Sequence, residues 1–215
     1  IHNEITTIDE KIKLLEKDKD KITKKITNLY IARNLSALGL FGKIASESAI
    51  SNLSIETSSN GLGGINNVGI LAGISCSKSV INCNVKGLIV AFGNNIGGMI
   101  GTSYSQKLTN CVASCTIYVD KVESNTNPTG RIGGLIGQQL GNSYTVYGCK
   151  SSTKIDSKLK NIGGMFGYCY DNGVISNSTA TGYVKTYDSF SGGFVGYVGS
   201  KVSILSCKSS TTAIA

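Results

Sequence analysis

Two adjacent glycines inside an apolar stretch have a spacing that could indicate a phosphate-binding loop. The stretch NIGGMIGTS runs from Asn95 to Ser103, and a third glycine, Gly101, follows the pair after three residues. Glycine-rich loops that open a helix bind phosphate through free backbone N–H groups, and the P-loop adds a lysine. Met99 stands where that lysine would be, and no helical pattern follows. We therefore interpret these glycines as residues that let a strand bend or pack closely against a neighbour.

Cysteine, histidine and acidic residues offer little for catalysis or metal binding. The chain has seven cysteines but a single histidine, His2, and the C-x2-C spacing of a zinc site is absent. Nucleophilic catalysis needs a base beside the nucleophile, and glycoside hydrolysis needs two paired carboxylates. Asp120, Glu123 and Asp156 could form a small acidic patch, but we interpret them as solvated loop residues. The sequence predicts no enzyme activity, no metal and no cofactor.

The charge of the chain argues against nucleic acid as a partner, and its hydropathy argues against a membrane span. The net charge is +8, but the basic residues are spread along the sequence and are not interleaved with aromatic residues. Nucleic-acid-binding domains concentrate basic residues on one face. No apolar run approaches the roughly 20 residues that cross a bilayer. We therefore expect neither nucleic acid as a partner nor a membrane span.

Residues 1–35 form a separate segment, because they lack glycine and follow a heptad pattern. Isoleucine and leucine recur at spacings of three and four residues, which predicts a long α-helix with a coiled-coil seam. Isoleucine at both core positions favours three strands, and a polar core residue such as Lys19 can set the register. The expected oligomerisation residues are Ile5, Ile8, Ile12, Leu15, Lys19, Ile22, Ile26 and Leu29. The alternative is a helix whose apolar stripe packs on the rest of its own chain.

Residues 36–215 contain six copies of the glycine motif. Well-preserved copies are IGGMIG (Ile96–Gly101) and IGGLIG (Ile132–Gly137). The closing glycines recur about every 30 residues, which indicates a repeat architecture. These repeat glycines are Gly42, Gly73, Gly101, Gly137, Gly167 and Gly196.

A second element follows each glycine motif, and in most copies its fourth residue is cysteine. Examples are VINCNV (Val80–Val85) and LTNCVA (Leu108–Ala113). We expect the fourth residues to form a column, in which Leu53 and Ser178 replace cysteine. The core cysteine column consists of Cys83, Cys111, Cys149 and Cys207. We interpret it as buried thiols that pack as small apolar groups, with disulfides as the alternative.

A third apolar element, such as CTIYVD (Cys115–Asp120), ends several of the repeats. None of the three elements has a helical period. Three short strands in about 30 residues fit one turn of a parallel β-solenoid, in which turns stack about 4.8 Å apart and equivalent residues form columns. We therefore expect a mainly β fold, a parallel β-solenoid of about six turns, preceded by the N-terminal helix. A propeller, whose blades are longer, is the competing repeat fold.

The pairing of IGGxxG with a downstream NC element resembles the GLUG repeat family. The resemblance covers roughly residues 37–213 and is most specific in IGGMIG…LTNCVASCTI and IGGLIG…VYGCKSSTKI. The sequence departs from the pattern where Leu38 and Leu40 replace glycines and where Ser178 replaces cysteine. The resemblance implies a β-solenoid scaffold in an extracellular or surface-anchored, adhesin-like protein. The heptad segment lies outside the family pattern.

The longest repeat, between Gly101 and Gly137, contains an insertion with the only proline, Pro128. Insertions in solenoids map to loops, which often lie on the binding face. If the chain binds a glycan or a host surface, we expect the ligand at this loop; the alternative is a tolerated loop. The candidate ligand residues are Tyr118, Glu123, Asn125, Asn127 and Arg131.

Taken together, the heptads and repeats predict a non-catalytic extracellular structural protein. In this hypothesis a rod-like subunit self-assembles into a fibre, filament or surface layer, through a coiled-coil oligomer or head to tail. The alternative is a cell-surface adhesin or fibre tip that binds glycans or a host surface. A polysaccharide-degrading β-helix enzyme is a third alternative, which would need clustered acidic or basic residues on one face.

Overall fold

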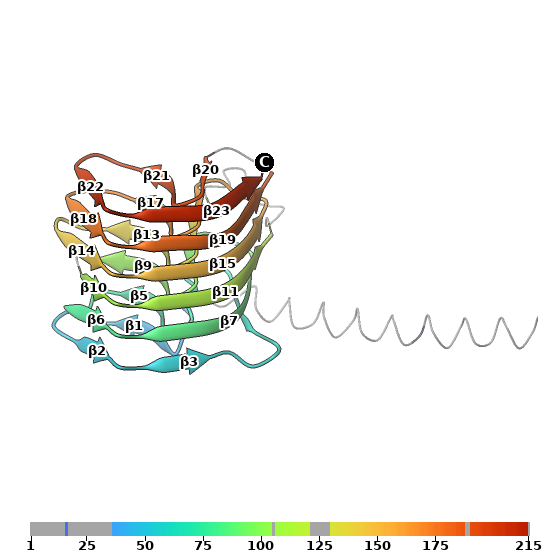
Figure 1. Ribbon diagram of the computed structural model, residues 1–215. Coiled ribbons are helices and arrows are strands. Elements are labelled where there is room, and N and C mark those ends of the chain that lie inside the picture. The colour runs from blue at the N-terminus through green and yellow to red at the C-terminus, as the bar shows by residue number, and fades with distance from the viewer. Residues whose placement is uncertain (1–15, 17–35, 105, 121–129, 188–189, 215) are drawn as a thin grey trace, which may run out of the picture. The chain divides into compact units, whose positions relative to one another are not determined.

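The computed structural model describes residue 16 and residues 36–104, 106–120, 130–187 and 190–214. The chain divides into two units, Ile1–Asn34 and Leu35–Ala215. The heptad segment and its oligomerisation residues lie outside the described residues, apart from Glu16, so the coiled coil stays a prediction. Leu35–Ala215 is a parallel β-solenoid, and the expected mainly β fold of this part is confirmed (Figure 1).

Four parallel sheets form the walls of the solenoid. Sheet 1 consists, in spatial order, of β1 (Phe41–Ile44), β5 (Ala72–Ser75), β9 (Ile100–Tyr104), β13 (Ile136–Leu140), β17 (Phe166–Cys169) and β21 (Val195–Val198). Sheet 2 consists of β2 (Ala49–Ser51), β6 (Ser79–Ile81), β10 (Lys107–Thr109), β14 (Tyr144–Tyr147), β18 (Gly173–Ser176) and β22 (Val202–Leu205).

The other two sheets differ greatly in strand length. Sheet 3 consists of β3 (Ser54–Glu56), β7 (Asn84–Ala91), β11 (Val112–Val119), β15 (Lys150–Ser157), β19 (Thr179–Thr186) and β23 (Lys208–Ile214), and β4 (Leu62–Gly64) also pairs with β7. Sheet 4 consists of the two-residue strands β8 (Ile96–Gly97), β12 (Ile132–Gly133), β16 (Ile162–Gly163) and β20 (Ser191–Gly192).

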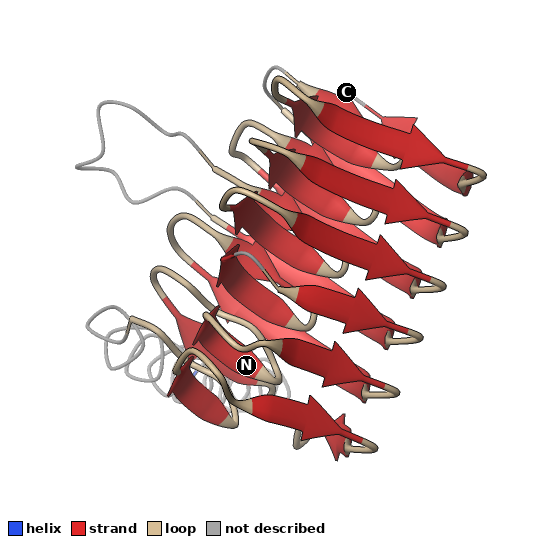
Figure 2. Ribbon diagram, turned by 90° about the vertical axis from the view of Figure 1, so that its left-hand side faces the viewer, coloured by secondary structure: helices blue, strands red, loops and turns tan. Residues whose placement is uncertain are grey.

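The chain passes through sheets 1, 2, 3 and 4 in each complete turn and then returns to sheet 1. Neighbouring turns pair in parallel, for example Ile100 with Ile136 and Ile117 with Ile155. Six strands in sheet 1 give six turns, the number that the repeat predicted. Figure 2 shows these turns stacked on one another. We call β1, β2 and β3 turn one, and β21, β22 and β23 turn six.

The glycine motif is two short strands that meet at a corner, and not one strand. In IGGMIG, Ile96 and Gly97 belong to sheet 4, whereas Ile100 begins β9 in sheet 1. A complete turn therefore has four strand segments rather than the three expected. A strand of two residues has no alternation of apolar and polar side chains, so it could not be predicted from the sequence.

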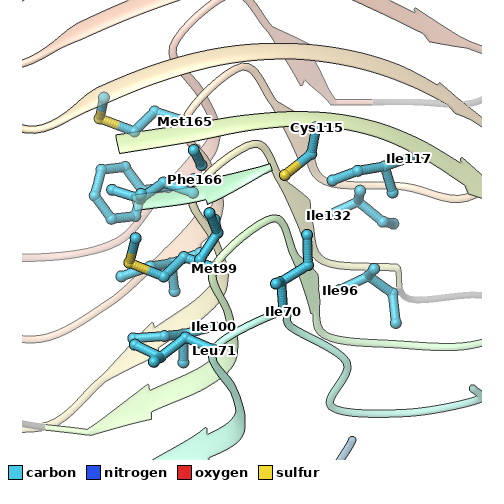
Figure 3. Packing of buried hydrophobic residues seen from close by; sticks show 14 of the residues in the cluster. Ile70, Leu71, Ile96, Met99, Ile100, Cys115, Ile117, Ile132, Met165 and Phe166 are labelled. Carbon is cyan, nitrogen blue, oxygen red and sulfur yellow. The ribbon is translucent and has the colours of Figure 1, made fainter. Parts of the chain in front are cut away.

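Apolar side chains fill the interior in columns that run along the solenoid. Met99 and Ile100, which lie between the glycines of one motif, are both fully buried. Ile100 shares a column with Ile136 and Phe166 of the next two turns, and Figure 3 shows Phe166 and Met165 above Met99 and Ile100. Because one turn covers the apolar side of the next, the core depends on stacking.

Asparagine holds the corner between sheet 2 and sheet 3 in most turns. Asn110 adopts φ 53°, and Gly148 takes the same position one turn later with φ 64°. Left-handed backbone suits glycine and, among side-chain-bearing residues, asparagine. The residues of this corner are Asn52, Asn82, Asn110, Gly148, Asn177 and Ser206. The amide of Asn82 also donates a hydrogen bond to Oδ1 of Asn52 over 3.3 Å, which links two turns.

Candidate functional site

The closing glycines after the first repeat lie where the chain enters sheet 1, against the backbone of a neighbouring turn. A Cβ atom on Gly101 would lie 2.5 Å from the carbonyl carbon of Asn67, and one on Gly137 would lie 2.5 Å from the nitrogen of Ile96. Real Cβ atoms essentially never come within 3.0 Å of such atoms. The motif therefore builds the scaffold, and its glycines have a packing role that does not require a ligand.

The core cysteine column follows the corner between sheet 2 and sheet 3. Backbone hydrogen bonds set its register: Val112 N–H donates to the carbonyl of Cys83, and Lys150 N–H donates to that of Cys111. The thiols of the three inner turns are fully buried, whereas Cys207 in turn six is only partly covered. All seven cysteines of the chain are free thiols.

Two buried thiols, those of Cys115 and Cys149, favour the protonated form. Desolvation raises the pKa of Cys115 to about 12. The contact with Cys111 raises the pKa of Cys149, and burial raises it further. Because the thiolate is the reactive form of cysteine, these two thiols are inert at neutral pH.

A buried polar cluster lies at the inner corner between sheet 1 and sheet 2, and its members bond to one another. The hydroxyls of Ser75 and Ser77 donate to Oε1 of Gln106 over 2.9 and 2.8 Å. The amide nitrogen of Gln106 donates to the hydroxyl of Ser103. This closed cluster stabilises the corner and offers no open group to a ligand.

The structure places the two described residues of the predicted ligand loop on different sheets. Tyr118 is exposed on the outer face of sheet 3, whereas Arg131 begins the segment that enters β12. Glu123, Asn125 and Asn127 lie outside the described residues. In the described part of the chain, no interaction joins Tyr118 to Arg131, so a ligand site built from both stays a prediction.

Arg131 instead lies along the outer face of sheet 1, where it links three turns. Its Nη1 donates to Oδ1 of Asn95 over 3.4 Å and to Oε1 of Gln138 over 3.1 Å. Its guanidinium carbon lies 5.0 Å from the ring centre of Tyr168, a distance typical of a cation–π contact.

Tyr168 continues this stack into turn six. Its ring lies parallel to that of Tyr197, with centres 4.9 Å apart and planes 6° apart. The two tyrosines belong to one outward column, which in chain order is Lys43, Ile74, Thr102, Gln138, Tyr168 and Tyr197. Tyr197 is the last member of this column. No further strand of the described chain therefore covers the face of its ring that points away from Tyr168.

The core is open at turn six. Ile204 of β22 belongs to the column of Val80, Leu108, Val146 and Ile175, all fully buried. Ile204 is 38 % exposed, and Val198 of β21 is 45 % exposed although Cys169 beside it is fully buried. These side chains line a hollow of about 400 Å³ together with Phe194, Val195 and Cys207.

Turn one leaves the opposite end of the same columns partly uncovered. Ile50, Leu53 and Ile55 are partly exposed, whereas their partners in the next turn, Val80, Cys83 and Val85, are buried. Turn one and turn six are the outer members of sheets 1, 2 and 3. Among the described strands, none pairs with their outer edges, which carry backbone groups beside apolar side chains.

The two described acidic residues that were considered for catalysis, Asp120 and Asp156, each lie beside a lysine. Asp120 pairs with Lys158 over 3.1 Å, and Asp156 lies beside Lys185 in the register of sheet 3. Among the described residues, no three histidine, cysteine or acidic side chains gather closely enough to hold a metal ion. Within the same residues, no helix has the length and apolar character needed to cross a membrane.

Sequence reasoning expected head-to-tail contacts, but it did not single out the residues of the open end or the tyrosine stack. Both had a signal, because Tyr168 and Tyr197 directly follow closing glycines, and Ile204 begins a second element as Val80 and Leu108 do. Aligning the repeats therefore predicts which residues share a column, but the exposure of each side chain in a column depends on how the turns stack. No protein-family model, curated protein or solved structure matches the chain.

Proposed function

We propose that this protein is a non-catalytic structural subunit whose solenoid stacks end to end with further copies into an extracellular or cell-surface rod. The observation that carries the proposal is the open core of turn six, where Ile204 is exposed although the members of its column in turns two to five are buried. An uncovered strand edge beside apolar side chains is a template for another chain. The resemblance to GLUG repeats supports the extracellular location and the scaffold role.

The occupant of the open end is turn one of a second copy, because the two turns have matching corners. Ile50, Leu53 and Ile55 are spaced as Ile204, Cys207 and Ser209 are. The corner residue has φ 55° in turn one, at Asn52, and φ 51° in turn six, at Ser206. A second copy placed one strand spacing away would therefore continue the columns of sheets 2 and 3 in register.

Side chains outside the core also suit this junction. Lys43 is the first member of the column that ends at Tyr197, so it would lie over that ring much as Arg131 lies over Tyr168. In the described part of turn six, Lys201 and Lys208 carry positive charge and there is no acidic side chain, whereas turn one contains Glu47 and Glu56. Opposite charge favours this orientation over contacts between two identical ends.

The energy of the junction is moderate. Complete burial of an apolar side chain such as Ile204 or Val198 contributes about 1.5–3 kcal/mol. Association costs several kcal/mol of translational and rotational freedom. New backbone hydrogen bonds along three strands add to the favourable side. We therefore expect assembly that depends strongly on protein concentration.

Two neighbouring substitutions in β22 test the proposal. Ile204→Lys places a charge inside the open end, whereas Leu205→Lys places it on the outer face of the same strand, where Leu205 is 54 % exposed. Sedimentation velocity and negative-stain microscopy of the unchanged chain should show rods that grow with concentration. Ile204→Lys should abolish them, and Leu205→Lys should preserve them.

Two results would contradict end-to-end stacking. One is an unchanged chain that stays monomeric at every concentration tested. The other is assembly that survives Ile204→Lys, which would place the contact elsewhere, for example in the heptad segment. Circular dichroism of each variant shows whether its solenoid is intact.

A further inference from the structure

Lysine residues gather on the outer face of sheet 3, although they are scattered in the sequence. The strands of sheets 1 and 2 carry one lysine each, Lys43 and Lys107. The strands of sheet 3 carry Lys86, Lys150, Lys154, Lys185 and Lys208. Stacking in register brings these residues to one side of the solenoid, so the charge is less evenly spread than the sequence suggested.

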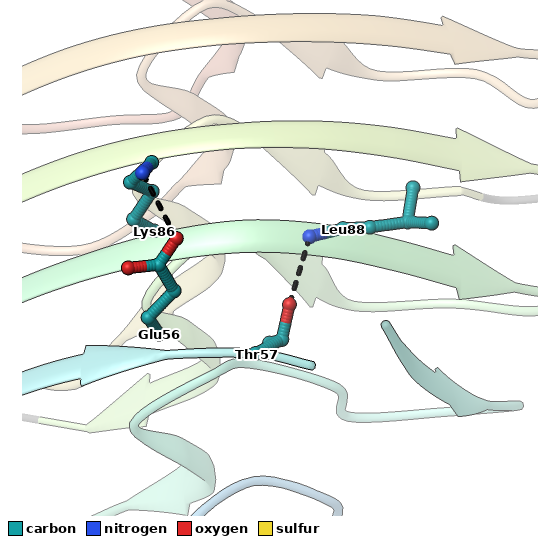
Figure 4. Close-up of polar contacts among 4 residues, drawn as sticks. All are labelled: Glu56, Thr57, Lys86 and Leu88. Atoms are coloured by element: carbon teal, nitrogen blue, oxygen red, sulfur yellow. Dashed lines mark hydrogen bonds and ion pairs between the residues drawn. The ribbon is translucent and has the colours of Figure 1, made fainter. Parts of the chain in front are cut away.

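The two acidic residues of this face have lysine neighbours. Glu56 binds Lys86 over 2.9 Å (Figure 4), and Asp156 lies beside Lys185 in register. In the described part of the chain, no ion pair joins an acidic side chain to the remaining lysines, Lys150, Lys154 and Lys208. The part of sheet 3 toward turn six therefore has an excess of positive charge.

These three lysines have a fixed geometry. Lys150 and Lys154 lie on one strand, four residues and therefore about 13 Å apart. Lys208 lies in the column of Lys150, two strands and about 10 Å away. Such spacing suits a partner with repeated anionic groups along an extended chain better than one small anion.

Hydroxyl groups occupy the surface between the lysines. One column contains Ser114, Ser152, Thr181 and Ser210, and the neighbouring column contains Thr116 and Tyr183. Such side chains donate and accept hydrogen bonds, which matches the hydroxyls of sugars. The strands of sheet 3 contain no arginine. Arginine is the side chain that most often binds nucleic-acid bases and phosphates through two parallel hydrogen bonds.

We propose that the outer face of sheet 3 binds a linear anionic polysaccharide that carries sulfate or carboxylate groups. Lys150, Lys154 and Lys208 pair with the anionic groups, and the serine and threonine columns contact the sugar hydroxyls. Lys150 and Lys154 lie on the side of the solenoid and not on its ends, so a test at these two positions is separate from end-to-end stacking, whereas Lys208 belongs to turn six.

Binding of fluorescently labelled dextran sulfate to the full chain tests this proposal, with uncharged dextran as the control ligand. The test variant is Lys150→Gln/Lys154→Gln. The control variant is Lys78→Gln/Lys107→Gln, which removes the same charge from exposed positions outside sheet 3. We expect about tenfold weaker binding in the test variant and less than twofold in the control. Added salt should weaken binding, because it screens exposed charges.

Three outcomes would overturn the proposal. Equal losses in the two variants would indicate attraction by net charge and not by this face. Equal binding of dextran and dextran sulfate would indicate that charge is not recognised. Tighter binding of a DNA duplex of equal charge, lost in the test variant, would assign the face to nucleic acid.

Discussion

At the scale of single residues, the repeat glycines are constrained by backbone atoms that cannot move aside. Gly137→Ala should destabilise the solenoid by about 1–3 kcal/mol, because the added methyl group meets the backbone of Ile96 and Asn95. Gly42 holds the same motif position in the first repeat, but a Cβ there meets the oxygen of Ala37 at 3.1 Å. Gly42→Ala is therefore the matched control, and urea unfolding should show a much smaller loss. Equal losses would mean that the corner relaxes in every turn.

The buried thiol of Cys115 gives the stability of the protein a dependence on alkaline pH. Its ordinary pKa is 9.0, and burial raises this value to about 12 in the folded state. The folded state therefore keeps the proton that the unfolded chain loses. The contribution of Cys115 is full below about pH 9 and decreases by about 1.4 kcal/mol per pH unit up to about pH 12.

Cys115→Ala tests this dependence. The free energy of unfolding of the unchanged chain and of the variant can be compared in urea between pH 8 and pH 10.5. The variant starts lower because it leaves a small cavity, but its stability should decrease less steeply above pH 9. Parallel pH profiles would show that the thiol is not protected in the folded state.

At the scale of the element, the corner between sheets 2 and 3 depends on left-handed backbone. Asn110→Val should cost about 2 kcal/mol or more, because a β-branched side chain is poorly accommodated at φ 53°. Asn110→Gly should be far milder, since Gly148 holds the same corner one turn later. Thermal unfolding of both variants checks the expectation. Equal losses in the two variants would assign the role of Asn110 to its amide side chain, which both variants lack, and not to its backbone.

The number of turns and most of their strands could be predicted, because the same sequence pattern recurs in each repeat. The spacing of closing glycines gave the turns, and the fourth residues of the second elements gave the cysteine column. The strands of sheet 4 could not be predicted, because Ile96 and Gly97 are too short a pair to show a period. The contact of Arg131 with Tyr168 was also hidden, because it joins residues of different turns whose register only the stacked structure defines.

At the scale of the whole molecule, each turn of the solenoid packs on its neighbours, which predicts that one turn can be removed. Deletion of Ile132–Asn161 joins Arg131 to Ile162, which pairs with Ile132 in the intact chain. Arg131 would then precede its stacking partner Tyr168 within the same turn. The shortened chain should keep its β-sheet circular dichroism and unfold in one transition. The urea m-value should decrease by about a sixth, since it scales with the surface exposed on unfolding.

A smaller deletion is the control for this modularity. Removal of Ile132–Val146 takes away the strands of sheets 4 and 1 and most of the sheet 2 strand but keeps β15, so the remaining turns cannot continue in register. We expect this chain to aggregate or to unfold at much lower urea, although it loses fewer residues than the complete-turn deletion. If both deletions were tolerated equally, the strands would be able to change partners, and the columns of side chains would not determine the register of the fold. If neither folded, the six turns would form one cooperative unit and not a stack of separable ones.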